Sequence, residues 1–134
     1  MTSDNEIEKE IGAKGLTAPR VTLAHIENTI DWEYYFTADN VLPSATPVIG
    51  AGKGDPRPSL RCLTFCVLVL KNGFTVTGEN ACASPQNFDA ELGRKVARQN
   101  AVNKVWMLEG YLLKERLFND ASVSYGPSRT KEGL

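Results

Sequence analysis

The chain has 134 residues, a length that fits one domain. Its formal net charge of −1 argues against a general nucleic-acid-binding protein, which is usually basic. No apolar run is long enough to span a membrane, and the N-terminus lacks the apolar segment of a signal peptide. We therefore expect a cytoplasmic protein that binds neither a membrane nor a specific nucleic acid.

The two ends differ in composition from the middle. Residues 1–10 carry four carboxylates against one lysine, and residues 119–134 are mostly small, polar or helix-breaking. Such composition is typical of mobile tails. We expect an acidic tail over 1–16, a single domain over 17–118 and a second tail over 119–134.

The first regular elements are predicted between residues 22 and 38. Thr22 can cap a short helix that extends to Ile30, and the aromatic segment Trp32–Ala38 favours a strand. Residues 40–59 contain four prolines and three glycines, so we expect a long loop without regular structure.

The centre of the chain predicts a β-hairpin. Asn72-Gly73 is the strongest short signal for a two-residue type I′ turn, which would place Val69 opposite Val76. The predicted core side then consists of Leu63, Phe65, Val67, Val69, Phe74 and Val76. The other side is a mixed face with Cys62, Thr64, Cys66, Leu68 and Leu70 beside Thr75, Thr77 and Glu79.

A long helical pattern follows and runs to about Phe118. Ser84 can cap it with Pro85 at the first helical position, and Asn87 is a second possible cap. Its apolar side changes direction midway, which predicts two helices or one kinked helix with the bend between Arg98 and Ala101. The fold class is therefore α+β, a small antiparallel β-sheet around a central hairpin with two or three helices packed on one face.

Amide side chains interrupt the apolar stripe of this helical segment. Gln99, Asn100 and Asn103 stand where hydrophobic residues would continue it. One interpretation is a helix end that faces water or bonds the sheet. The other is a pocket in which Phe88 or Trp106 stacks on a planar ligand and the amides bind its edge.

Charged residues near the same segment suit a ligand with phosphates. Arg94 and Arg98 lie one helical turn apart, and guanidinium groups bind phosphate well, although a solvated helix face is the simpler interpretation. Glu79, at the end of the hairpin, is a candidate to accept ligand hydroxyls or to cap a loop.

No catalytic signature is present in the sequence. His25 is the only histidine, and it has no nucleophile motif beside it. Cys62 and Cys66 would lie about 13 Å apart on one strand, too far for a disulfide, so buried reduced thiols are favoured over a metal site. These features predict a binding protein without a cofactor rather than an enzyme.

Several longer motifs resemble a known family. The segments "NGFTVTGENAC", "NFDAELGRKVA", "QNAVNK" and "LEGYLL", together with "LTAPRVTLAHIE" upstream, resemble the phage and prophage gene-product forty-nine/sixty-six family. The chain is also similar to phage Thoeris anti-defence proteins. That resemblance implies a small antiparallel sheet with two helices, a homo-oligomer, and sequestration of cyclic ADP-ribose-type immune signals without cleavage.

The resemblance implies a phage-encoded sponge in the host cytoplasm for a small adenine-containing cyclic nucleotide. The expected roles are stacking by Phe88, recognition of the base edge by Asn100 and Asn103, and phosphate binding by Arg94 and Arg98. The alternative is a protein–protein interaction module that binds a host or phage protein through the mixed sheet face. The complete set of predicted site residues is Phe88, Arg94, Arg98, Gln99, Asn100, Asn103, Trp106 and Glu79.

Overall fold

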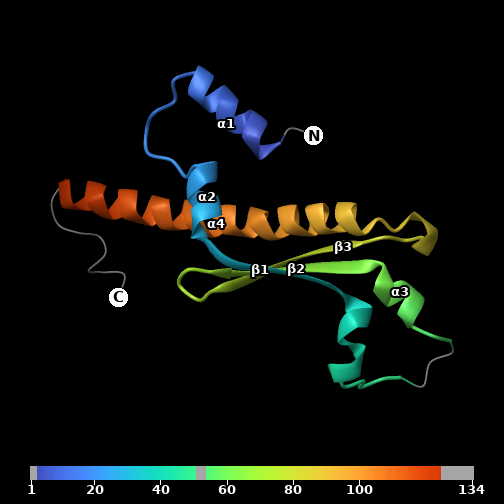
Figure 1. Cartoon of the computed structure of the whole chain (residues 1–134). Coiled ribbons are helices and arrows are strands. Elements are labelled where there is room, and N and C mark those ends of the chain that lie inside the picture. Colours follow the sequence, from blue (N-terminus) through green and yellow to red (C-terminus); the bar gives the residue numbers. More distant parts are fainter. Residues whose placement is uncertain (1–2, 51–53, 125–134) are drawn as a thin grey trace. The chain divides into compact units, whose positions relative to one another are not determined.

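The computed structural model describes residues 3–50 and 54–124 of the chain (Figure 1). In chain order the elements are α1 (Asp4–Ala13), α2 (Leu23–Thr29), β1 (Ile30–Thr37), the 3-10 helix η1 (Ala38–Ser44), α3 (Arg57–Arg61), β2 (Leu63–Leu70), β3 (Thr75–Ala81), the 3-10 helix η2 (Pro85–Asn87) and α4 (Ala90–Ser124).

The chain divides into two compact units, which we describe separately. The sheet unit comprises residues 29–104, and the terminal unit comprises residues 1–28 together with 105–134. Helix α4 contributes its first part to the sheet unit and its remainder to the terminal unit. The single domain expected over 17–118 stays a prediction.

The three strands form an antiparallel sheet in the order β1-β2-β3 (Figure 1). Strand β2 lies in the middle and pairs with β1 on one side and with β3 on the other. Strands β2 and β3 form the expected hairpin. The prediction of an α+β fold with a small antiparallel sheet is therefore confirmed.

The hairpin loop is one residue longer than predicted. The Leu70 N–H donates to the Phe74 carbonyl at 2.8 Å, and the Gly73 N–H donates to the Leu70 carbonyl at 2.8 Å. Gly73 has φ +88°, and no non-glycine residue in the described ranges has a positive φ. Asn72 therefore lacks the left-handed conformation that a two-residue type I′ turn needs, and the loop consists of three residues.

This slip of one residue reverses the face of β2 that lies in the core, whereas Val76 on β3 is buried as predicted. Val76 lies opposite Leu68 rather than Val69, and Gly78 lies opposite Cys66. The buried side of β2 is therefore the side predicted to be mixed, with Cys62, Thr64, Cys66, Leu68 and Leu70. The side of β2 predicted as core is only half-buried, and Phe74 is exposed.

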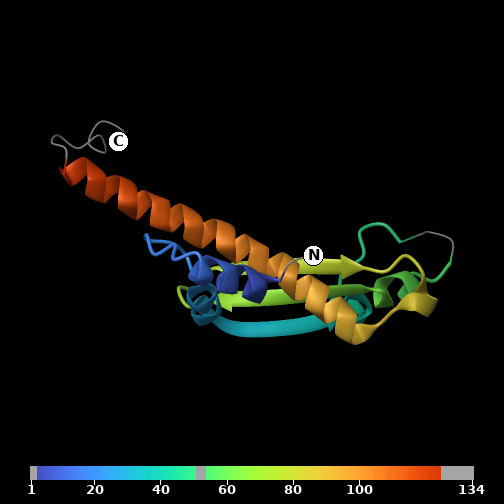
Figure 2. The same cartoon turned by 90° about the horizontal axis from the view of Figure 1, so that it is seen from above.

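The first part of α4 packs against the sheet with very close backbone contact (Figure 2). A Cβ atom on Gly78 would lie 2.1 Å from the Ala97 carbonyl oxygen and 2.3 Å from the Ala101 nitrogen. A Cβ atom on Gly93 would lie 2.9 Å from Thr64 Oγ1. Ala97 and Ala101 are fully buried. Glycines and alanines thus allow the helix to approach the sheet.

Helix α4 is continuous over its 35 residues, so the alternative of two separate helices is wrong. It contains no proline, and its exposed amides require no break in the backbone. The helix begins after Asp89, whose carboxylate accepts the Leu92 N–H at 3.1 Å. The predicted cap Ser84 instead precedes η2 and makes no capping bond with its side chain.

Two short helices form within or beside the segment predicted as a long loop. Helix η1 includes Pro43, and α3 begins directly after Pro56. Pro58 lies in the first turn of α3, where the N–H that proline lacks would be unpaired, whereas Pro43 lies near the end of η1. Proline density therefore did not exclude helical turns at either end of residues 40–59.

In the terminal unit, α1 occupies much of the segment predicted as an acidic tail. Its capping box explains the helix, because the Glu6 N–H donates to Ser3 Oγ at 3.1 Å and the Ser3 N–H donates to the Glu6 carboxylate at 3.2 Å. No α1 residue is buried. The mobility of this segment stays a prediction.

The remaining helix ends bear on two further predictions. Thr22 Oγ1 accepts the His25 N–H at 3.0 Å, which confirms the predicted cap of α2. The tail predicted over 119–134 is helical up to Ser124, and residues 125–134 lie outside the described ranges. No helix in the described part of the chain is long and apolar enough to cross a membrane.

Candidate ligand pocket

A pocket of about 170 Å³ opens in the sheet unit beside the first turn of α4. Water occupies about 30 Å³ per molecule, so the pocket has room for one ring or one phosphate group rather than a whole dinucleotide. Its lining combines aromatic rings, short polar side chains and one arginine: Tyr35, Phe36, Phe88, Thr37, Asn40, Thr64 and Arg94.

The segments that meet at this pocket are far apart in the sequence. Strand β1 supplies Tyr35 to Thr37, β2 supplies Thr64, and α4 supplies Arg94. Asn40 lies in η1, where its carboxamide oxygen accepts the Thr37 N–H at 3.2 Å. Phe88 has an extended backbone between η2 and α4 and so belongs to neither helix. The pocket therefore depends on the tertiary fold.

Arg94 is the charged side chain of the pocket. It is exposed, and its guanidinium forms no ion pair with another residue of the described ranges. The N-terminus of α4 adds partial positive charge nearby, although the Asp89 carboxylate already accepts one N–H of the first turn. The arrangement favours an anionic or electron-rich group.

Thr64 carries a polar atom without a partner at the same pocket. The residue is 2% exposed, and within the described ranges its hydroxyl oxygen has no hydrogen-bond partner. Leaving such a group unpaired costs about 1–3 kcal/mol. The fold retains this hydroxyl although valine would fill a similar space.

A hydrogen-bonded network lies behind the pocket wall. Glu33 accepts from Arg98 Nε at 2.8 Å and from the Tyr35 hydroxyl at 2.8 Å. Burial raises the pKa of Glu33, but the hydrogen bonds from Arg98 and Tyr35 outweigh it and hold that pKa below its usual value. Burial, followed by the bond to Glu33, raises the pKa of Tyr35. The network fixes the Tyr35 ring, which lines the pocket.

Two of the predicted site residues, Phe88 and Arg94, line the pocket, whereas the amides contact other protein groups. Gln99 Nε2 donates to Asn103 Oδ1 at 2.9 Å, and Asn100 Nδ2 donates to the Glu79 carbonyl at 2.8 Å. The Glu79 carboxylate accepts the Thr77 hydroxyl at 3.1 Å. Arg98 is paired with Glu33. Roles of these residues in ligand binding stay predictions.

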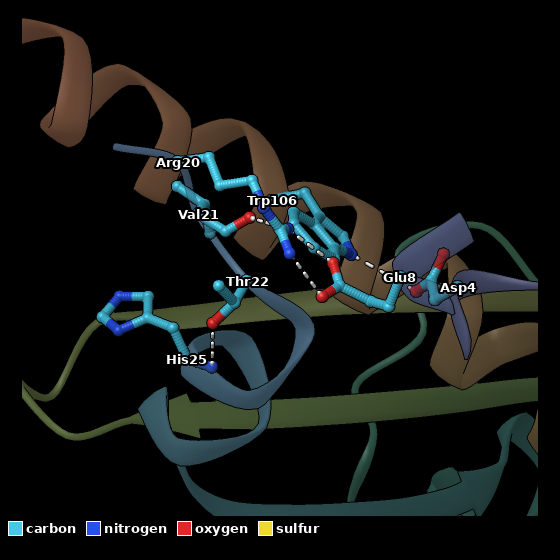
Figure 3. Close-up of polar contacts among 7 residues, drawn as sticks. All are labelled: Asp4, Glu8, Arg20, Val21, Thr22, His25 and Trp106. Atoms are coloured by element: carbon cyan, nitrogen blue, oxygen red, sulfur yellow. Dashed lines mark hydrogen bonds and ion pairs between the residues drawn. The ribbon is translucent and has the colours of Figure 1, made fainter. Parts of the chain in front are cut away.

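The remaining predicted residue, Trp106, belongs to the terminal unit (Figure 3). Its indole N–H donates to the Asp4 carboxylate at 3.3 Å, while Arg20 donates to both oxygens of Glu8 at 2.9 and 3.0 Å. The hydrogen bond from Arg20 lowers the pKa of Glu8. These polar contacts hold α1, which has no buried side chain.

A second hollow in the described part of the chain is a weaker candidate. A hollow of about 470 Å³ along residues 11–22 is more open, and its only charged lining residue, Arg20, is already paired with Glu8. Across residues 3–50 and 54–124, no three potential metal-ligating side chains lie together. The cysteines are free thiols, and Cys62 and Cys66 are buried as expected.

Sequence analysis missed the pocket residues that come from the sheet and η1. Nothing in the sequence distinguished Thr37 or Asn40 as site residues, and Tyr35 was one of several aromatic residues in a predicted strand. Thr64 did carry a signal, because it is a polar residue in the alternating row with Cys62 and Cys66. Only the correct register would have shown that this row is buried.

A family model matches most of the chain. It is described as the phage protein (N4 Gp49/phage Sf6 gene 66) family, and it matches residues 21–117. The match includes every segment that lines the pocket. No curated protein and no solved structure shows a significant match.

Proposed function

The chain belongs to this phage protein family, and we propose that it is a non-enzymatic binding protein encoded by a phage. It sequesters a small adenine-containing cyclic nucleotide, an immune signal, in the host cytoplasm and releases it unaltered. Phe88 stacks on the adenine, and Arg94 binds a phosphate group.

The pocket at the start of α4 is the observation that carries this proposal. Phe88 lines it together with Tyr35, and aromatic stacking contributes about 1–3 kcal/mol per base. Arg94 adds a guanidinium that no carboxylate of the described ranges neutralises, and guanidinium groups bind phosphate oxygens in pairs. Stacking and charge therefore meet within one cavity.

The size of the pocket indicates how a ligand would be held. Pockets for drug-sized molecules measure roughly 300–1,000 Å³, and this one is smaller at about 170 Å³. One moiety of a nucleotide enters, and the remainder lies at the opening. A second subunit of a homo-oligomer would complete the enclosure, in keeping with the proposed oligomer.

The other predicted residues take secondary roles in this proposal. Arg98 is paired with Glu33, so the phosphate role falls first to Arg94. Asn100 and Asn103 already bond protein groups, and they would contact a base edge only at the pocket opening. Glu79 supports Asn100 through its main-chain carbonyl.

The proposal is tested by purifying the protein from infected host cells that produce the signal. Native mass spectrometry is expected to show a homo-oligomer with a retained small molecule. Heating then releases this molecule with its original mass, and adding it back raises the melting temperature. Release of an altered molecule would indicate an enzyme.

A matched pair of variants sharpens this test. Phe88→Ala is expected to abolish retention of the small molecule. Phe74→Ala removes an exposed phenylalanine from the same unit, outside the pocket, and should leave retention unchanged. Equal retention by both variants would contradict the assigned site.

A second candidate function, binding to a host or phage protein, is favoured by the open face of the sheet. The mixed face first suggested for this role is covered by α4, as the buried Thr64 and Leu68 show. The opposite face carries Trp32 and Tyr34, whose rings stack with their centroids 6.1 Å apart. These side chains are 59% and 52% exposed. Exposed aromatic pairs are typical of interaction surfaces. Capture of a defined partner that Trp32→Ala abolishes and Phe88→Ala does not would favour this function.

A further inference from the structure

We infer that Thr64 determines ligand specificity in this pocket, and that its hydroxyl donates a hydrogen bond to a phosphate oxygen of the ligand. The inference rests on the proposed function and adds a defined subsite to it. It assigns a role to the one buried side-chain polar atom for which the fold provides no partner in the described ranges.

Thr64 belongs to a polar row that crosses the sheet. It lies opposite Thr37 on β1 and opposite Asn80 on β3. Thr37 donates its own hydroxyl to the Asp39 carboxylate at 2.5 Å rather than to Thr64. Thr64 is the buried member of this row, and a buried hydroxyl is unfavourable unless it meets a polar partner.

Helix α4 cannot supply that partner. Gly93 lies directly over Thr64, because a Cβ atom added to Gly93 would lie 2.9 Å from Thr64 Oγ1. As a glycine, it has no side chain that could accept or donate a hydrogen bond. Its N–H is already bonded to the Asp89 carbonyl at 2.9 Å. The same close packing that brings α4 onto the sheet therefore leaves the Thr64 hydroxyl without a partner from the helix.

Arg94 indicates which chemical group of a ligand would contact the Thr64 hydroxyl. It follows Gly93 in the chain and lines the same pocket as Thr64. A group that contacts both side chains meets a full positive charge and a hydroxyl donor near a helix N-terminus, which favours an oxyanion. Phosphate fits this chemistry better than a neutral ribose hydroxyl.

Calorimetric titration of the full chain tests the inference with ADP, adenosine and inorganic phosphate as probes. Thr64→Val removes the hydroxyl and keeps the shape, whereas Thr64→Ser keeps the hydroxyl. Thr64→Val is expected to raise the melting temperature without ligand, because an unpaired buried hydroxyl is lost. It should also weaken ADP binding about tenfold or more, while Thr64→Ser retains it. A purely structural role does not produce these opposite changes.

The outcomes separate this inference from the proposed function. An unchanged ADP affinity in Thr64→Val overturns the inference and leaves adenine binding intact. Thr64-dependent binding of inorganic phosphate, with ADP no tighter, supports the subsite and contradicts the adenine role. Binding of none of the three probes overturns the inference, whereas the proposed function is tested by the cyclic nucleotide itself. If Thr64→Val does not fold, Thr64→Ala replaces it in the comparison of ADP affinity with Thr64→Ser.

Discussion

Single residues of the pocket differ in how far the sequence could reveal them. Phe88 and Arg94 were identified because Phe88 lies just before α4 and Arg94 lies near its start. Within a helix, local spacing determines which side chains are neighbours. Tyr35 and Thr64 come from two strands, and their position depends on a pairing that the sequence did not specify. Asn100 and Arg98 were predicted from the same spacing, but they contact Glu79 and Glu33.

The network around Glu33 predicts how stability depends on pH. The folded protein holds the pKa of Glu33 below its usual value near 4.3, so this stabilisation is present above that pH and is lost as pH falls through the folded pKa. Tyr35 has a raised pKa, so its contribution is present below about pH 10 and is lost as pH rises above that value. We expect urea unfolding to show a plateau between these limits.

Glu33→Gln tests the acid side of this plateau. The loss of unfolding free energy between about pH 7 and about pH 3 should shrink by about 0.5 kcal/mol, a small value because solvent partly screens the pair. Glu91→Gln is the matched control, since Glu91 pairs with Lys95 on an exposed helix face. An identical acid response in the two variants would contradict the assigned network.

At the scale of elements, the sequence predicted the three strands and helices α2 and α4, but neither the short helices nor the sheet register. Val, Thr and aromatic residues indicated β1 to β3, and Asn72-Gly73 located the turn. One extra loop residue, Lys71, exchanged the buried and open faces of β2 relative to the prediction, because side chains alternate along a strand. Helix α1 was missed because acidic composition outweighed the local capping box at Ser3 and Glu6.

The contact between β3 and α4 predicts a strong effect of one methyl group. Gly78→Ala places a Cβ against the Ala97 and Ala101 backbones, which cannot move without shifting the helix. We expect a loss of about 3 kcal/mol in unfolding free energy, at the upper end of the usual range for overpacking. Chemical denaturation measures it.

Gly110→Ala is the control for this substitution. Gly110 also lies in α4, but nothing lies within 4 Å of the position of its Cβ. Alanine there should stabilise the helix by up to about 1 kcal/mol. Equal effects of Gly78→Ala and Gly110→Ala would show that the helix does not approach β3 so closely.

At the scale of the whole molecule, family membership identifies a phage protein, and the chemistry of the pocket is what supports the proposed ligand. The chain is a phage protein whose matched residues 21–117 include every residue of the pocket. The sequence suggested binding without catalysis, and the pocket supplies stacking surfaces, a guanidinium and a hydroxyl donor. Its small volume makes a homo-oligomer part of the proposal.

Calorimetric titration of the intact chain with cyclic ADP-ribose tests the central claim most directly, when wild type and Phe88→Ala are compared and the ligand is recovered afterwards. The account predicts saturable binding to wild type, binding about tenfold or more weaker in Phe88→Ala, and recovery of unaltered ligand. Absence of binding to wild type, equal affinity of the two proteins, or a chemically altered ligand would contradict it.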